Sequence, residues 1–518
     1  MIQNKLLHTY TFLTIFFTAI ISLQARAQNR FTEPKRELRG VWVSTVVNID
    51  WPSEAGLPST QQKQELLRIL DAHQRAGINA IFLQVRPSAD AIYAKGKELW
   101  SRFLTGKQGI PPSPWYDPLE FAIQEAHARG MELHAWFNPY RATFDLSEAN
   151  VSGEHITKQH PEWFFTYAGK KLFNPGIPEV QQYIVDVIMQ VVQNYDIDGV
   201  HFDDYFYPYP VAGQTIPDYP TYRRYGKDFR TIDDWRRNNV NQLIQTLADN
   251  IHQAKKYVKF GVSPFGIWQN KKQDPAGSET SGLSGYGQLY ADARMWLQQG
   301  WVDYINPQIY FPFNYRAAAF ETLLAWWGEN AYGKHVYVGQ AAYKASSNTT
   351  GWRNRSELPN QIRYLRKNPH IQGSVYFSSK SLVNNLGGFR DSLQYNFYRY
   401  KSLPPTMPWI DSIAPLAPQN LTFHNLNAGG IALRWDAPPA ALDGEQAYGY
   451  VIYRFNQGEP INLGNAQNIL EIMFDHSRTF YTDQSVRKGA QYTYVVTAID
   501  RMKNESGPSN ISMVLASR

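Results

Sequence analysis

Eight apolar runs rich in β-branched and aromatic residues recur along residues 38–379, and a stretch with helical periodicity separates each run from the next. The stretch 178–192 is typical, because Pro178 opens it and its apolar residues recur at the i, i+3, i+4, i+7 spacing of one helix face. Before the second run, Ser59 and Gln62 predict a capping box. The predicted strands are 38–46, 78–87, 131–140, 198–208, 259–268, 302–311, 335–343 and 371–379.

This alternation predicts an α/β fold with a parallel sheet, and eight units are the number that closes a (β/α)8 barrel. The alternative is an open doubly wound sheet, which would usually carry a Gly-rich phosphate turn after its first strand. No such turn follows residue 46. We therefore predict a (β/α)8 TIM-type barrel over residues 28–403.

Polar residues gather at the carboxyl ends of the predicted strands, where barrels of this kind carry their active sites. Because side chains alternate between the two faces of a strand, one set is predicted to point towards the barrel mouth. This set comprises Arg86, Asn138, His201, Asp203, Gln308 and Tyr310. Asp90, Arg141 and Trp268 come just after strand ends and are predicted to lie on the same rim.

The first residues have the pattern of a secretory signal peptide. Lys5 gives a positive start, the run 12–23 is apolar, and Ala25-Arg26-Ala27 is a small-x-small cleavage site. The apolar run is too short to span a bilayer comfortably, and an uncleaved membrane anchor is the alternative. We expect a cleavable signal peptide over 1–27, no membrane span after its removal, and a periplasmic or secreted mature protein.

From Pro404 the pattern changes to closely spaced prolines followed by short alternating strands. The prolines predict a stiff linker over 404–414. The strands, expected at 421–423, 431–435, 448–455, 479–482 and 492–499, predict a β-sandwich over 415–518. The motifs Leu433-Arg-Trp435, Tyr450-Val-Ile-Tyr453 and Tyr492-Thr-Tyr-Val-Val-Thr-Ala-Ile-Asp500 resemble a fibronectin type III domain. We expect its Trp435 to fill the core and the module to be a spacer or docking unit without chemistry.

Composition excludes several classes of chemistry. The 518 residues include no Cys, so disulfides, thiolate metal sites, iron–sulfur clusters and a Cys nucleophile are excluded. The formal net charge is only +6 and no dense run of Lys and Arg occurs, so a nucleic-acid partner is not expected. The 15 Trp, 33 Tyr and 27 Phe suit sugar stacking, although aromatic rings also fill cores.

The densest polar cluster is the fourth predicted strand, 198–208, which carries three acids and a histidine. Cleavage of a glycosidic bond needs one carboxyl group to protonate the leaving oxygen and a second to attack or to activate water. Because neighbouring strand residues point to opposite faces, Asp203 and Asp204 can both face the lumen only if the strand breaks between them. A structural alternative is that these acids pair with Arg86 or Arg141. The catalytic candidates are Asp203, Asp204 and Asp90, with Asp274 and Glu279 as further candidates for the partner acid.

Long motifs spread over about 31–400 carry a family likeness. They include Arg36-Glu-Leu-Arg-Gly-Val-Trp-Val-Ser44, His134-Ala-Trp-Phe-Asn-Pro-Tyr-Arg141, Asp198 to Pro208, Ser263-Pro-Phe-Gly-Ile-Trp-Gln-Asn270 and Pro307-Gln-Ile-Tyr310. Together they resemble the glycosyl-hydrolase-like family ten, a bacterial exported family with a glycosidase-type barrel. The resemblance implies a glycoside hydrolase, in at least some members acting on peptidoglycan glycan strands stripped of their peptides. Only the Asp203/Asp204 motif is carried over as the catalytic pair.

The fourth strand also has a superficial similarity to the chitinase pattern Asp-Gly-x-Asp-x-Asp-x-Glu. Here His201 stands at the second acidic place, and Tyr205 stands where the proton-donating glutamate belongs. This departure argues against chitinase-style, substrate-assisted chemistry.

The main hypothesis is an exported glycoside hydrolase that needs no cofactor and cleaves a polysaccharide, peptidoglycan glycan above all, at the barrel mouth. One alternative is a non-catalytic glycan-binding protein, and another is a metal-assisted sugar deacylase centred on His201. No bound metal is expected, because the spacing around His201 matches no specific metal motif. Trp268 and Tyr310 are either sugar platforms or packed rings. The candidates for substrate binding are Arg86, Asn138, Arg141, His201, Trp268, Gln308 and Tyr310.

Overall fold

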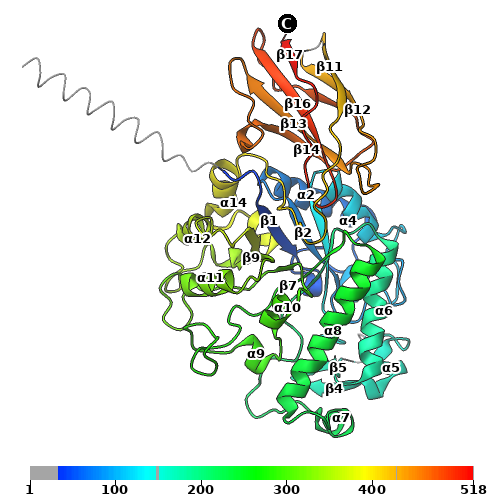
Figure 1. The fold of residues 1–518 in the computed structure, drawn as a ribbon. Coiled ribbons are helices and arrows are strands. Elements are labelled where there is room, and N and C mark those ends of the chain that lie inside the picture. Colours follow the sequence, from blue (N-terminus) through cyan, green and yellow to red (C-terminus); the bar gives the residue numbers. More distant parts are fainter. Residues whose placement is uncertain (1–32, 148–150, 428, 517–518) are drawn as a thin grey trace, which may run out of the picture.

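The computed structural model describes residues 33–147, 151–427 and 429–516, so the predicted signal peptide lies outside the described residues. Figure 1 shows a barrel wrapped by helices, with a sandwich of strands (orange to red) stacked on one end of it. Within the described ranges, no helix combines the length and the apolar character needed to cross a bilayer.

Eight parallel strands close the barrel, and each pairs with the strands of the preceding and following βα units. The ring is closed where β1 pairs with β10, from Leu38 opposite Gly373 to Val41 opposite Tyr376. All residues of these strands are buried, which explains why they are continuous apolar runs in the sequence. The predicted barrel is confirmed. Its strands are β1 (Leu38–Val43), β2 (Ala80–Arg86), β3 (Glu132–Phe137), β6 (Gly199–Phe202), β7 (Lys259–Val262), β8 (Tyr304–Ile305), β9 (His335–Gln340) and β10 (Gly373–Tyr376).

A helix follows each barrel strand and covers its outer face, and α6 and α8 lie side by side there (Figure 1). α6 starts at Pro178, and the predicted apolar stripe from Val180 to Val192 faces the barrel. The helices that complete the eight units are α2 (Ser59–Arg75), α4 (Pro118–His127), α6 (Pro178–Asn194), α8 (Ile232–Ala254), α10 (Ala293–Gln299), α11 (Phe320–Glu329), α12 (Glu357–Leu365) and α14 (Phe389–Ser392). Shorter helices lie in the connections: α3 (Arg102–Thr105), α5 (Ile156–Gln159), α7 (Tyr219–Tyr225), α9 (Gly285–Gln288) and α13 (Ser379–Val383).

The capping box predicted for α2 is wrong. The Ser59 hydroxyl donates to the Pro114 carbonyl, and the Gln62 side chain donates to the Leu57 and Leu104 carbonyls. The Ser59 amide donates to Ser113 instead of to Gln62. The loop 104–114 therefore takes the contacts that a capping box would have made locally.

Alternate strand residues fill the barrel lumen with rings. The imidazole of His201 stacks on the Tyr304 ring at 6.0 Å between centroids and 8° between planes. Glycines on the neighbouring strands make room for these rings, because a Cβ on Gly199 would lie 2.3 Å from His134 Nδ1 and one on Gly261 would lie 2.1 Å from the Tyr304 ring. The lumen is therefore a packed core, and any cavity must lie above it at the mouth.

A hairpin that the sequence analysis did not predict projects from the rim between β3 and α6. Its strands β4 (Phe164–Tyr167) and β5 (Lys170–Phe173) pair antiparallel, and a backbone bridge joins Leu172 to Arg141. The hairpin therefore forms a wall beside the end of β3.

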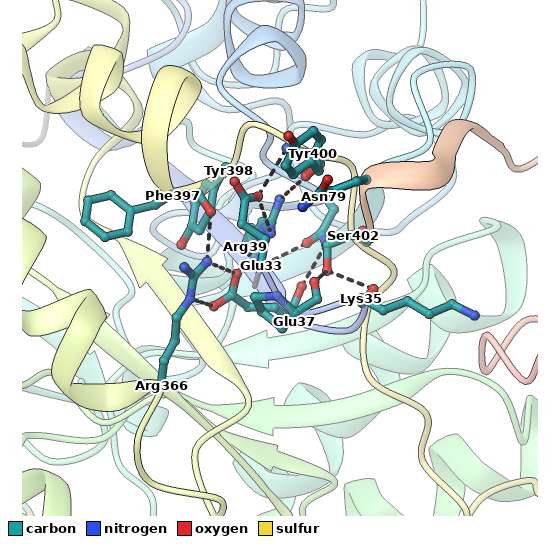
Figure 2. A network of polar contacts seen from close by, with 12 residues as sticks. Glu33, Lys35, Glu37, Arg39, Asn79, Arg366, Phe397, Tyr398, Tyr400 and Ser402 are labelled. Carbon is teal, nitrogen blue, oxygen red and sulfur yellow. Dashed lines mark hydrogen bonds and ion pairs between the residues drawn. The ribbon is translucent and has the colours of Figure 1, made fainter. Parts of the chain in front are cut away.

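A buried polar network ties the first strand of the barrel to the segment that follows its last unit (Figure 2). Arg366, just after α12, donates to both carboxylate oxygens of Glu37 at 2.7 Å, and Arg39 Nε donates to Glu37 at 2.9 Å. Arg39 also donates to the Tyr400 carbonyl at 2.7 Å. Burial alone would raise the pKa of Glu37, but the two guanidinium groups hold it below its usual value. This network closes the barrel at the end opposite the mouth.

The chain beyond residue 415 forms a two-sheet β-sandwich, as predicted. One sheet has the order β11-β12-β15 and the other β14-β13-β16-β17. Trp435 is 1% exposed and packs against Tyr450, which confirms its place in the core. Two strands, β14 and β17, were not predicted, and the fibronectin type III assignment itself stays a prediction. The strands are β11 (Gln419–Asn425), β12 (Ile431–Asp436), β13 (Gly449–Asn456), β14 (Ile469–Met473), β15 (Phe480–Asp483), β16 (Gln491–Ile499) and β17 (Ser512–Leu515).

The segment 404–414, which the prolines predicted to be a stiff linker, packs against the barrel. Met407 and Ile410 are buried against the barrel floor, and Trp409 Nε1 donates to Asp303 Oδ1 at 3.0 Å. The proline-rich segment is therefore a strap that packs under the barrel.

The sandwich inserts a lysine into the floor of the barrel. Lys503, in the turn after β16, is fully buried, and its Nζ lies 3.2 Å from Glu132 Oε1. Glu132 is the first residue of β3 and also pairs with Lys259 Nζ at 2.6 Å. The sandwich is thus fixed to the amino ends of the strands and leaves the opposite mouth uncovered (Figure 1).

Candidate active site

A cavity of about 540 Å³ opens at the carboxyl ends of the barrel strands, a size ordinary for a ligand site. Much of its wall is aromatic, and flat rings of this kind suit the faces of sugars. Two adjacent acids, Asp203 and Asp204, form part of the same wall. The aromatic lining residues are Trp42, Trp136, Phe144, Tyr167, Tyr205, Phe206, Tyr207, Tyr209, Tyr310, Tyr343 and Phe377.

Both acids line the cavity because β6 ends at Phe202, before either of them. The predicted strand 198–208 is therefore much shorter in the structure, and strand alternation no longer separates the two side chains. The sequence analysis required the strand to break between Asp203 and Asp204, and in the structure it ends one residue earlier, before Asp203. Neither acid is ion-paired with Arg86 or Arg141 among the described residues, so the structural alternative is not observed.

Three donors hold the Asp203 carboxyl group. Oδ2 accepts from Trp136 Nε1 at 3.2 Å and from the Asn138 side-chain amide, and Oδ1 accepts from the Tyr205 backbone amide at 3.1 Å. Both lone pairs of Oδ2 are thus in use. This leaves Oδ1 as the oxygen that can carry an acidic proton.

The pKa of Asp203 is raised to about 7, first by burial and next by the charge of Asp204, while Arg141 and the hydrogen-bond donors oppose the shift. A carboxyl group with this pKa is about half protonated at pH 7, so it can act as a general acid near neutral pH. Its neighbour Asp204 accepts from Gln308 Nε2 at 3.1 Å and from the Tyr209 hydroxyl. Burial raises the pKa of Asp204 as well, and these two donors work against that rise.

The raised pKa of Asp203 predicts a specific dependence of stability on pH. A group whose pKa is higher in the folded state adds stability at low pH, and this stability is lost as the pH rises through the folded-state value. Between pH 5 and pH 8 the wild-type protein should lose about 2–3 kcal/mol that Asp203→Asn does not lose. Urea unfolding of both proteins at the two pH values measures this difference. Parallel pH profiles for the two proteins would contradict the raised pKa.

Three of the predicted substrate-binding residues line the cavity, namely Arg141, Gln308 and Tyr310. The Arg141 guanidinium lies 4.8 Å from the centre of the Tyr205 ring, and its charge lowers the pKa of both acids. Gln308 bridges Asp204 and the Ser263 carbonyl, so it positions the acid and also faces the cavity.

Arg86 and Asp90 are corrected by the structure, because neither lines the cavity. Arg86 forms a two-pronged, fully buried ion pair with Glu98 at 2.7 Å, so it is a structural residue. Asp90 is buried among Ser88, Gln108 and their neighbours, where burial raises its pKa to about 7. It cannot serve as the partner acid from this position.

Asn138 and His201 lie beneath the cavity floor, so they do not touch a ligand directly. Asn138 is fully buried, accepts from Gln84 and donates to Asp203, which makes it a positioning residue for that acid. His201 accepts from Trp42 Nε1 at 3.1 Å and contacts the Tyr304 hydroxyl at 3.3 Å through its other nitrogen. Both ring nitrogens are thus occupied within the core.

Trp268 and the two acids predicted in the loop after the fifth strand, Asp274 and Glu279, also lie outside the cavity lining. Trp268 stacks on Trp326 at 5.5 Å and donates to Asp292 Oδ1 at 3.1 Å, so it is a packed ring. Glu279 pairs with Lys271 on the surface, and Asp274 accepts from a backbone amide of its own loop.

Sequence reasoning missed several residues that shape the site. Trp136 lies in the motif 134–141. Because it stands two residues before Asn138, strand alternation places both side chains on the lumen face, and this spacing could have identified it. Tyr209 and Lys170 carry no such signal, because a loop and an unpredicted hairpin bring them to the cavity. The Ser263 hydroxyl is buried beside the cavity and has no hydrogen-bond partner among the described residues.

A family model described as "Glycosyl hydrolase-like 10" matches residues 37–353, which include Asp203, Asp204 and most of the barrel. The chain belongs to this family. The resemblance inferred from the motifs is thereby confirmed, and it supports a glycoside-hydrolase type of function on a carbohydrate.

Curated relatives match along most of the chain. "Glycosyl hydrolase YngK" of Bacillus subtilis is 43% identical over 499 residues, which are 95% of this chain and 95% of that protein. "Glycosyl hydrolase DigH" of Escherichia coli K12 is 39% identical over 369 residues, which are 67% of this chain and 83% of that protein. Among solved structures, the PgaB (BpsB) glycoside hydrolase domain of Bordetella bronchiseptica aligns with a TM-score of 0.44 and 13% identity, over 70% of this chain and 98% of that one.

The donor set at the mouth does not fit the metal-centred alternative. His201 would be its central ligand, but both ring nitrogens are engaged below the cavity floor. In the described part of the chain, the three carboxylates close enough to share an ion are Asp411, Asp443 and Glu445, on the strap and the sandwich. They lie outside the set of residues that line the cavity.

Proposed function

We propose that this protein is an exported glycoside hydrolase that cleaves O-glycosidic bonds in peptidoglycan glycan strands at the barrel mouth. The observation that carries this proposal is the pair Asp203 and Asp204 on one wall of an aromatic-lined cavity, with the pKa of Asp203 raised to about 7. Family membership supports the reaction class, and the signal-like pattern of residues 1–27 supports export. The choice of peptidoglycan glycan follows the family resemblance.

In this proposal, Asp203 acts as the general acid. Its Oδ1 proton passes to the oxygen of the leaving sugar as the bond from that oxygen to the anomeric carbon breaks. Ionised Asp204 stabilises the positive charge that develops on the sugar and takes a proton from the water that adds to the anomeric carbon. Trp136 and Asn138 keep the Asp203 carboxyl group in place through the reaction.

The test is hydrolysis by the mature protein, residues 28–518. It is incubated with amidase-treated peptidoglycan, with intact peptidoglycan and with chitin oligomers, and new reducing ends are measured. We expect new reducing ends from amidase-treated peptidoglycan. Tight binding without bond cleavage would instead indicate a glycan-binding protein, and release of acetate without new reducing ends would indicate a deacylase.

The activity should fall at alkaline pH. The pH dependence of kcat/KM reports the pKa values of the free enzyme, and the general acid must be protonated. Because the pKa of Asp203 is about 7, kcat/KM should fall about tenfold per pH unit above that value. A rate that rises through pH 7 would mean that Asp203 works as an ionised base, which would reverse the assignment.

A further inference from the structure

The cavity carries two positive charges in addition to its two acids. Arg141 and Lys170 both line it, and the described lining contains no further cation. Arg141 lies beside the acids, since its charge lowers the pKa of both of them. When Asp203 is protonated, the cavity therefore has a surplus of positive charge.

Lys170 has no counter-ion among the described residues. It is the first residue of β5, so the β4–β5 hairpin presents it at the cavity wall. Its Nζ lies 4.9 Å from the centre of the Phe144 ring, and no carboxylate among the described residues lies within ion-pair distance of it. The side chain is half-buried, so water screens its charge only in part.

This position is unfavourable for an ammonium group in the unliganded protein. Burial, and next the charge of Arg141, lower the pKa of Lys170 below its usual value. A ligand anion placed between the two cations would remove the repulsion and supply the missing counter-ion. The backbone bridge from Leu172 to Arg141 holds the hairpin and Arg141 together, so the two cations share one wall.

We propose that Lys170 and Arg141 form an anion subsite that binds a carboxylate carried by the substrate sugar, and that Lys170 makes the site selective for acidic glycan strands. This inference rests on the proposed function, because it names the substrate class of the same cavity. The charge of Arg141 acts on both acids as well as on the ligand, whereas we assign Lys170 to the ligand alone.

The chemistry of the proposed substrate fits this subsite. In peptidoglycan, the peptide is joined by an amide to a carboxyl group on every second sugar. Removal of the peptide frees that group as a carboxylate, whereas a strand that keeps its peptides presents a neutral amide there. The subsite would therefore distinguish bare from peptide-bearing strands by charge as well as by size.

The test is a binding measurement with matched ligands and matched variants. The ligands are an oligosaccharide from amidase-treated peptidoglycan with free carboxylates, and the same oligosaccharide with its carboxylates converted to methylamides. Calorimetry is carried out in an Asp203→Asn background, so that no ligand is consumed. We expect Lys170→Met to weaken binding of the carboxylate ligand about tenfold and to leave binding of the methylamide ligand unchanged.

Two controls separate charge recognition from a general loss of structure. Lys170→Arg should retain the preference for the carboxylate ligand. Lys171→Met, next to it on the hairpin but outside the cavity lining, should behave like the parent protein. Equal weakening of both ligands, no weakening of either, or failure of the parent to bind the carboxylate ligand would overturn the subsite.

The outcome is independent of the proposed hydrolysis. Selective binding that depends on Lys170, without new reducing ends from the wild-type protein, would uphold the subsite and refute the glycosidase. If the wild-type protein hydrolyses the glycan and the Lys170→Met variant loses no selectivity, the glycosidase is upheld and the subsite is refuted.

Discussion

The Asp203→Asn variant is expected to lose about 10²–10⁴-fold in kcat on amidase-treated peptidoglycan, with a much smaller change in KM. A positioned general acid contributes about that much to a rate, and an amide cannot donate a comparable proton. Asparagine has nearly the same shape, and its oxygen can still accept from Trp136 and Asn138, although its NH2 group cannot accept from the Tyr205 amide. Initial rates of reducing-end formation at pH 6, where Asp203 is mostly protonated, measure the loss.

The matched control is Asp90→Asn. Asp90 resembles Asp203 in two respects, since it is buried at the rim and burial raises its pKa to about 7. It differs in lying outside the cavity lining. We expect Asp90→Asn to keep kcat within a few-fold of the wild-type value. Comparable losses of kcat in the two variants would mean that removal of any buried acid disables the protein. Asp203 would then no longer be assigned as the general acid.

The second large effect concerns stability and the floor of the barrel. Lys503→Met should lower the free energy of unfolding by about 3 kcal/mol, because it removes one cation from a fully buried carboxylate. Glu132 would keep only Lys259 as a charged partner at 2.6 Å. The burial of Glu132 is tolerable because both lysines hold its pKa well below the usual value against the effect of desolvation. The midpoint of urea unfolding at pH 7 measures the change.

Lys488→Met provides the comparison for this variant. Lys488 is an exposed lysine of the same sandwich, and its replacement should change stability by less than about 0.5 kcal/mol. The folded Lys503→Met protein should retain the wild-type kcat, because Lys503 lies at the end of the barrel opposite the acids. If both variants unfold at the same urea concentration, the sandwich is attached to the barrel without stabilising it.

The sequence by itself determined the barrel, because each strand is buried on both faces and must be a continuous apolar run, while each covering helix repeats its apolar residues every three or four positions. It also identified the acid pair, since Asp203 and Asp204 stand directly after such a run. Strand alternation failed as a guide beyond the true strand ends. β6 ends at Phe202, so the acids belong to a loop whose side chains follow no fixed period.

Only the tertiary structure decided which polar residues of the rim reach the cavity. Arg86 turns to Glu98 and Trp268 turns to Trp326, because buried charges and indole rings are stabilised by whichever partner the fold brings near. The same holds for the sandwich, where Lys503 reaches Glu132 across a large separation in sequence. Local patterns specify which elements form and which of their faces are apolar. The choice among polar partners depends on distances that exist only once the barrel has closed.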